Sequence, residues 1–194
     1  MDRDIEKVKV WDPFVRIFHW TVVISFIIAY LVEDDFLSLH VLAGYTILVL
    51  VFFRIMWGLV GSEHARFSDF VFRLRVVLDY LRDLITFRAK RYIGHGPAGG
   101  SMVIVLLIGL LLTSVSGLAL YGAEEYAGPL AGLMAGIGKA RVGALEEVHE
   151  FFAGFTLTMA VIHVMGVALS SFVHRENLIK GMFTGYKRAD EEFQ

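Results

Sequence analysis

Apolar residues gather in four long stretches of the chain, each of which contains few charged side chains. A helix needs about 20 such residues to cross the hydrocarbon core of a bilayer, which is roughly 30 Å thick. The pattern therefore predicts four membrane-spanning helices in a single domain that covers residues 1–194. Their expected ranges are about Phe14–Val32, Leu39–Val60, Gly100–Tyr121 and Glu147–Val173.

A fifth stretch, from Phe70 to Phe87, has a different pattern. Its apolar residues recur at positions 70, 74, 77, 81 and 84, and charged residues occupy several positions between them. One apolar face at helical spacing is typical of a helix that lies along a membrane surface. The predicted fold is therefore all-α, an integral membrane four-helix bundle with an interfacial amphipathic helix over residues 70–87, between the second and third spans.

The charges of the connecting segments predict the orientation. The link between the first and second spans holds Glu33, Asp34 and Asp35 and no basic residue. Basic residues favour the cytoplasmic side, so the basic link between the second and third spans is expected in the cytoplasm, together with both termini. The basic residues of that link are Arg66, Arg73, Arg75, Arg82, Arg88, Lys90 and Arg91, and those of the tails are Arg3, Lys7, Lys9, Lys180, Lys187 and Arg188.

The amino-acid composition limits the classes of function and of cofactor that the chain can have. The 194 residues are 56% hydrophobic, with a mean hydropathy of +0.62, as a membrane protein requires. A net charge of −2 gives no basic field for nucleic acid. Because cysteine is absent, disulfides, thiolate-bound iron–sulfur clusters and covalent haem attachment through C-x-x-C-H are excluded. A redox centre would need other ligands, and the seven histidines are the leading candidates.

Four histidines lie within or at the edges of the predicted spans: His19, His40, His149 and His163. Ionisable side chains at such depths are costly and usually face a partner. His149 and His163 are fourteen residues apart, which returns to nearly the same helix face after a rise of roughly 21 Å. By span direction, His40 shares the outer level with His149, and His19 shares the inner level with His163. Two imidazole pairs at two depths are what two haems with two axial histidines each require.

Other residues near these histidines fit the same hypothesis. Arg54 follows His40 by fourteen residues, so it lies on the same face at the inner level, where a haem propionate would supply the anion that a buried arginine needs. Small residues would let a flat macrocycle approach the backbone closely; they are Gly44, Gly154 and Gly166. Three cytoplasmic-side histidines, His64, His95 and His174, are either polar interfacial residues or contacts to a propionate or a quinone.

Simpler interpretations stay open at this stage. A single intramembrane histidine can be a hydrogen-bonded contact between helices. Zinc would want three or four ligands at one point, whereas these separate into twos, and ligand chemistry alone does not exclude copper. The acidic residues Glu33–Asp35, Glu124 and Glu125 are either solvated caps or a docking surface for a basic periplasmic partner.

Four stretches carry a resemblance to a known family: "VWDPFVRIFHW" (10–20), "RIMWGLVGSEHARFSDF" (54–70), "YIGHGPAGG" (92–100) and the final span beginning "VHEFFAG" (148–154). The chain resembles the bacterial cytochrome b561 and nickel–iron hydrogenase b-type cytochrome family. The resemblance implies a cytochrome with two non-covalent haem b groups, whose axial ligands would be His19, His40, His149 and His163. The sequence departs from the family pattern at "GHGP", where many relatives have asparagine before the proline.

The resemblance also implies the function. Members exchange electrons with the quinone pool and with a periplasmic redox protein, either a c-type cytochrome or a hydrogenase-like subunit. Electron transfer across the bilayer between such partners is therefore the expected role, and a homodimer is left open. One alternative is a standalone superoxide:quinone oxidoreductase, so the sequence does not decide whether the chain is itself an enzyme. An alternative of another class is a non-redox membrane anchor or metal-handling bundle.

Overall fold

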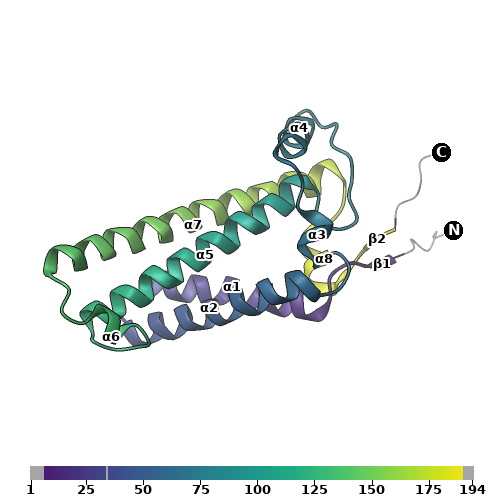
Figure 1. The fold of residues 1–194 in the computed structure, drawn as a ribbon. Helices are drawn as coiled ribbons and strands as arrows, with labels where there is room; N and C mark the ends of the chain where they lie inside the picture. Colours follow the sequence, from purple (N-terminus) through teal and green to yellow (C-terminus); the bar gives the residue numbers. More distant parts are fainter. Residues whose placement is uncertain (1–6, 34, 190–194) are drawn as a thin grey trace. The chain divides into compact units, whose positions relative to one another are not determined.

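The computed structural model describes residues 7–33 and 35–189. Four of its helices are long and apolar enough to cross a membrane: α1 (Pro13–Leu31), α2 (Leu37–Val60), α5 (Pro97–Glu124) and α7 (Lys139–Val173). Figure 1 shows these helices and the short elements that connect them. The predicted all-α membrane bundle is thus confirmed. Arg3 and Asp34, which entered the prediction of orientation, lie outside the described residues.

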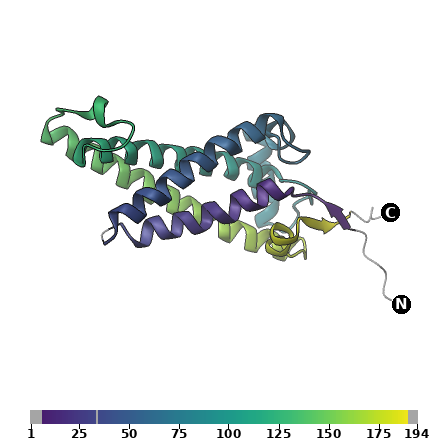
Figure 2. The ribbon, with the colours of Figure 1, turned by 90° about the horizontal axis from the view of Figure 1, so that it is seen from below.

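The short elements lie in the connections and near the ends of the described chain. They are α3 (Phe67–Phe70), α4 (Leu74–Ile85), α6 (Ala131–Met134), α8 (Leu178–Thr184), β1 (Lys7–Lys9) and β2 (Tyr186–Arg188). The two strands pair antiparallel with Val8 opposite Lys187, and Figure 2 shows them side by side next to α8. This ladder joins the segment before α1 to the segment after α8.

The chain forms two compact units. The first comprises residues 1–20, 54–104 and 161–194, and the second comprises residues 21–53 and 105–160. Each long helix therefore contributes one end to each unit. The first unit also contains α3, α4, α8 and both strands, whereas the second contains α6.

In the first unit, Asp12 fixes the start of α1. Its Oδ1 accepts a hydrogen bond from the Val15 amide at 2.9 Å, as an N-cap does, and Pro13 follows in the first helical position, where its missing N–H costs nothing. Its Oδ2 accepts from Trp57 Nε1 at 3.0 Å and from the Ser62 hydroxyl. Burial would raise the pKa of Asp12, but these hydrogen bonds outweigh it and lower the pKa. An ionised carboxylate thus ties the beginning of α1 to the end of α2.

The helix ends differ from the sequence-based ranges where polar residues continue a helix. The fourth long helix begins at Lys139, whereas the apolar pattern placed its start near Glu147. Its additional residues include Lys139, Arg141 and Glu146, so they add helical turns without adding apolar length. Likewise α5 begins at Pro97 rather than near Gly100, because proline is well suited to the first turn of a helix.

The prediction of one helix over residues 70–87 is wrong at its start. Phe70 ends the short helix α3, the backbone is extended at Val71 and Arg73, and α4 begins only at Leu74. The physical reason is that Phe70 is 1% exposed and packs against the His95 ring at 4.7 Å between ring centres. A residue buried in this way does not continue the exposed apolar face of an interfacial helix.

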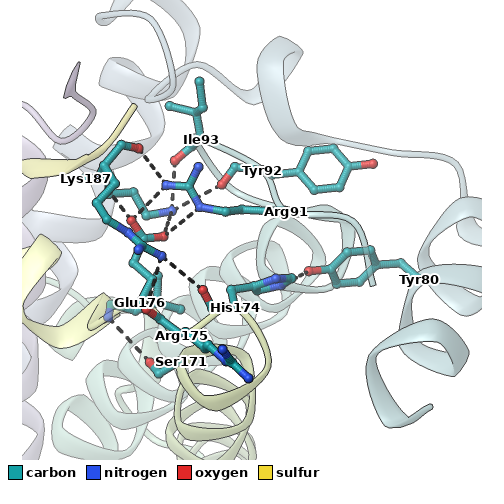
Figure 3. Close-up of polar contacts among 11 residues, drawn as sticks. Tyr80, Arg91, Tyr92, Ile93, Ser171, His174, Arg175, Glu176 and Lys187 are labelled. Atoms are coloured by element: carbon teal, nitrogen blue, oxygen red, sulfur yellow. Dashed lines mark hydrogen bonds and ion pairs between the residues drawn. The ribbon is translucent and has the colours of Figure 1, made fainter. Parts of the chain in front are cut away.

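A buried carboxylate closes the first unit near its C-terminal strand. Glu176 accepts hydrogen bonds from Arg91 Nη2 at 2.9 Å and from the Arg188 amide at 3.2 Å, and Lys187 Nζ lies 3.8 Å from it. Figure 3 shows Arg91 and Lys187 beside the Glu176 carboxylate. Burial would raise the pKa of Glu176, but the hydrogen bonds from Arg91 and the nearby positive charges lower it. The cluster therefore links the segment before α5, the end of α7 and β2.

Replacing Glu176 by glutamine should lower the thermal stability of the protein in detergent at about pH 7, by about 1–3 kcal/mol, because the partly buried Arg91 loses its charged partner. The pKa of Glu176 lies below its ordinary value of 4.5. Its contribution is therefore fully present above about pH 4.5 and is lost as the pH falls through the lowered pKa.

The measurement is thermal unfolding of both proteins from about pH 7 to about pH 3, with Glu63→Gln at an exposed position as the control. The difference between wild type and Glu176→Gln should narrow on acidification. A difference that stays constant over this range would contradict the assignment.

Candidate functional site

In the second unit, α2 and α7 bring His40 and His149 together. Their ring centres are 6.1 Å apart and their planes are inclined by 82°. Both rings line a cavity with about 1070 Å³ of space free of protein atoms, part of it open to solvent. Gly44 lies on the wall of the same cavity. This unit therefore holds one facing imidazole pair beside an open space.

The Nδ1 atoms of this pair have backbone partners. His40 Nδ1 lies 2.8 Å from the Ala29 carbonyl oxygen. His149 Nδ1 lies 3.0 Å from the Thr113 carbonyl oxygen and 3.2 Å from the Ser116 hydroxyl. A neutral imidazole that donates Nδ1–H to a carbonyl keeps the lone pair of Nε2 for a metal. These contacts fix the orientation of both rings and leave Nε2 of each free to bind a metal ion.

Small residues decide how closely the helices and a flat group can approach. A Cβ atom on Gly117 would lie 2.8 Å from the His149 ring, so only glycine fits between α5 and this histidine. At Gly44 and Gly154 a Cβ would meet no atom within 4 Å, which leaves open space at both positions. Thr113, Ser116 and Gly117 were not predicted, because α5 carries no histidine to draw attention to them. The only signal was the run of small residues "TSVSG" at 113–117.

In the first unit, α1 and α7 bring His19 and His163 together. Their ring centres are 6.4 Å apart, with an inclination of 58° between the planes. His19 also packs edge-on against Trp20 at 5.0 Å. His19 Nδ1 is buried, and within residues 7–33 and 35–189 it has no hydrogen-bond partner. Among the described residues, His19 thus has no carbonyl contact of the kind that holds His40 and His149.

Arg54 lies in the same unit and is 2% exposed. Its Nη2 donates to the Ala65 carbonyl oxygen at 3.1 Å, and its guanidinium lies 5.4 Å from the centre of the Phe67 ring. Its Nη1 is buried without a hydrogen-bond partner in the described part of the chain. The carboxylate of Asp12 interacts with the Arg54 charge, but no acceptor in the described residues reaches Nη1, so this nitrogen can bind a further anionic oxygen.

His95 lies close to Arg54. Its ring packs between Trp11 at 4.5 Å and Phe70 at 4.7 Å, and its Nδ1 is buried without a partner in the described residues. Burial lowers the pKa of His95 to about 3, with further lowering from the charge of Arg54. The imidazole is therefore neutral near pH 7 and acts as a hydrogen-bonding group.

His64 and His174 have local contacts. His64 has a positive φ of 68°, and its amide donates to Asp69 Oδ2 at 3.2 Å. His174 Nε2 lies 3.3 Å from the Tyr80 hydroxyl, an interaction drawn in Figure 3. The structure thus brings Arg54 and His95 together, and it places His174 against α4.

The ring separations fit a metal ion bound between two imidazoles. Two metal–nitrogen bonds of about 2 Å each, plus about 1.2 Å from each nitrogen to its ring centre, require ring centres about 6.4 Å apart. A direct hydrogen bond between the rings would bring the centres to about 5.2 Å. The observed separations of 6.1 and 6.4 Å match the first case. In the described ranges no three histidine or acidic side chains gather as a metal site, so the zinc alternative finds no support.

Comparisons with known proteins give the family. Residues 10–185 match the sequence profile described as prokaryotic cytochrome b561. The chain is 26% identical to the "Probable Ni/Fe-hydrogenase B-type cytochrome subunit" of Azotobacter chroococcum mcd 1, over 93% of this chain and 88% of that protein. Proteins with the same name from Rhodobacter capsulatus (24% identical, 93% and 81%) and Azotobacter vinelandii (25%, 93% and 88%) are also similar. No solved structure matches the chain.

Replacing Gly117 by valine should lower the haem content of the purified protein, because the new side chain would push the His149 ring out of position. The expected loss is up to half of the bound haem if each histidine pair holds one group. The measurement is haem per chain from absorption and quantitative protein analysis. Gly99→Val is the matched control on the same helix, since a Cβ there meets no atom within 4 Å. Equal haem contents in the two variants would count against the His149 geometry.

Proposed function

Because the chain belongs to the prokaryotic cytochrome b561 family, and is therefore a membrane b-type cytochrome of electron transfer, we propose that it holds two haem b groups, one at each histidine pair. It carries electrons between a periplasmic redox partner and the membrane quinone pool. The observation that supports this proposal is the spacing of the rings, 6.1 and 6.4 Å in two separate units. Haem iron bound by two histidines takes up and releases single electrons without opening a ligand position.

The residues of the chain position the ligands and supply charge. The carbonyls of Ala29 and Thr113 hold the rings of His40 and His149, which raises the basicity of their Nε2 atoms. Arg54 Nη1 and His95 Nδ1 lack partners in the described residues. A propionate near the His19/His163 pair would satisfy both: it would accept a hydrogen bond from Arg54 directly, and it would contact the neutral His95 through a proton held between the two groups or through a water molecule. His149 and His163 both lie on α7, fourteen residues apart in the sequence.

The charge distribution supports a direction of electron transfer. The cavity at His40 and His149 is lined by four acidic residues, Glu33, Glu124, Glu125 and Glu150, whereas Arg54 lies in the unit that holds the other pair. Negative surroundings lower a reduction potential and positive surroundings raise it. Electrons are therefore favoured to move from the His40/His149 site to the His19/His163 site.

The same acidic residues favour a basic protein over superoxide as the electron donor. They attract a protein with a basic face and repel an anion such as superoxide, because like charges slow encounter. The related proteins are named as subunits of nickel–iron hydrogenases, so a hydrogenase-like subunit is the first partner we propose, and a basic c-type cytochrome is the second. The basic link between α2 and α5 supports cytoplasmic termini and an inner-membrane location.

Replacing Arg54 by glutamine should lower the reduction potential of one haem by several tens of millivolts and leave the other unchanged. A unit charge about 10 Å away at an effective dielectric of about 20 contributes about 1.7 kcal/mol. The measurement is a redox titration of the purified protein followed by haem absorption. Arg54→Lys keeps the positive charge, so the reduction potential of that haem should stay close to the wild-type value. An unchanged potential at both haems would show that Arg54 serves another anion.

Transfer between the two sites is tested in proteoliposomes. A membrane-impermeant donor, a reduced basic c-type cytochrome, is added outside, and haem reduction and reoxidation by a short-chain quinone are followed separately. His149→Ala should abolish rapid reduction by the external donor but leave reoxidation by quinone in chemically reduced protein. Rapid reduction of His149→Ala, or wild-type haem that no quinone reoxidises, would contradict the proposal. Rapid reduction by superoxide instead would favour the standalone enzyme.

A further inference from the structure

Helix α4 has three distinct faces. At about 100° per residue, Leu74, Leu78, Leu81 and Ile85 fall on one stripe, and these four side chains are between 38% and 72% exposed. A second face, with Val77 and Leu84, is buried. A third face, with the acidic residues Asp79 and Asp83, lies on the far side of the helix from the stripe. A helix that only packed on the protein would need one apolar face, so the second one has an unassigned role.

The buried face fixes α4 against the end of a membrane span. Tyr80 bonds to His174 at 3.3 Å, immediately after α7 ends at Val173 (Figure 3). The Phe87 ring, just beyond α4, contacts the Phe172 ring in the last turn of α7 with 6.2 Å between centres. Since α7 is long and apolar enough to span a membrane, these contacts hold α4 at the level where that span ends.

Just beyond α4, an exposed aromatic ring joins the surface of that span. Phe172 is 73% exposed and Phe87 is 62% exposed, and both line a groove together with Ser171, Val173 and Arg175. Phe172 belongs to the apolar surface of a spanning helix, which the bilayer covers. The same bilayer therefore reaches Phe87, which lies two residues after Ile85, the last residue of the stripe.

Charge identifies the kind of lipid. Arg75 and Arg82 are seven residues apart, so they share one flank of the stripe at about 70–90° from its middle. Residues 71–90 contain five basic side chains and two acidic ones. Long arginine side chains beside an apolar stripe reach the level of the lipid phosphates, and basic clusters bind anionic headgroups most strongly.

We propose that α4 is a binding surface for anionic phospholipid: its stripe of Leu74, Leu78, Leu81 and Ile85 contacts acyl chains, and Arg75 and Arg82 hold the headgroup phosphates. The contact between Tyr80 and His174 then couples this lipid surface to the helix that carries His163. The proposal does not depend on haem number or on the electron-transfer partner.

The absence of cysteine from the sequence allows clean labelling at single positions. Leu78→Cys, Leu81→Cys and Asp83→Cys, each carrying an environment-sensitive fluorophore, are placed in nanodiscs of phosphatidylglycerol and phosphatidylcholine with brominated acyl chains. Labels at positions 78 and 81 should be strongly quenched by bromine, whereas the label at position 83 should stay in water. If labels at 78 and 81 behave like that at 83, or are shielded from water but not quenched, as a second copy of the chain would shield them, the proposal is overturned.

A second measurement tests the headgroups in the full-length protein. Phospholipid retained through detergent purification is quantified by mass spectrometry for wild type, Arg75→Gln/Arg82→Gln, and the control Lys139→Gln/Arg141→Gln at the other end of α7. In Arg75→Gln/Arg82→Gln, the ratio of retained phosphatidylglycerol to phosphatidylcholine should be several-fold lower than in wild type, and the haem content should be unchanged. The control should retain the wild-type ratio. Equal ratios in all three proteins would overturn the assignment of Arg75 and Arg82.

Discussion

Two imidazole rings that face each other across a gap too wide for a hydrogen bond are the feature on which this membrane protein depends. The separations of 6.1 and 6.4 Å are nearly equal although they arise in different units and on different helix pairs. Ring centres at this separation leave room for a metal ion between the two imidazoles, and we propose that a haem iron occupies each gap. Gly117, the carbonyl contacts of His40 and His149, and the buried Arg54 are consistent with that proposal.

The two pairs have different surroundings. Backbone carbonyls hold Nδ1 of His40 and His149, whereas His19 Nδ1 has no partner in the described residues and Arg54 and His95 share its unit. The charges differ in the same way. Residues 21–53 and 105–160 contain eight acidic and two basic residues, and the rest of the chain contains twelve acidic and sixteen basic ones. Under the proposal of one haem at each pair, these two environments would give the two haems different reduction potentials.

Much of this arrangement could be predicted from the sequence, because membrane spans have a strong apolar signal and helical geometry converts spacing into position. The fourteen residues between His149 and His163 were enough to place the two histidines on one face. Thr113, Ser116 and Gly117 were missed because they act on His149 from another helix, and a single sequence carries no trace of that contact. Phe70 was assigned to the interfacial helix because periodicity does not distinguish a residue facing lipid from one buried beneath Arg54. Glu176, which holds Arg91 and lies beside Lys187, gave no signal because a lone carboxylate after a span is usually solvated.

The central claim is that each histidine pair binds one haem. The most direct test is the number of haems per chain in the purified wild-type protein, with haem extracted and measured as its pyridine complex and the protein measured by amino-acid analysis. Two protoporphyrin haems per chain, both extracted by acidic acetone because the chain has no cysteine to bind them covalently, is the expected result. One haem per chain at saturating haem supply, or none, would contradict the account.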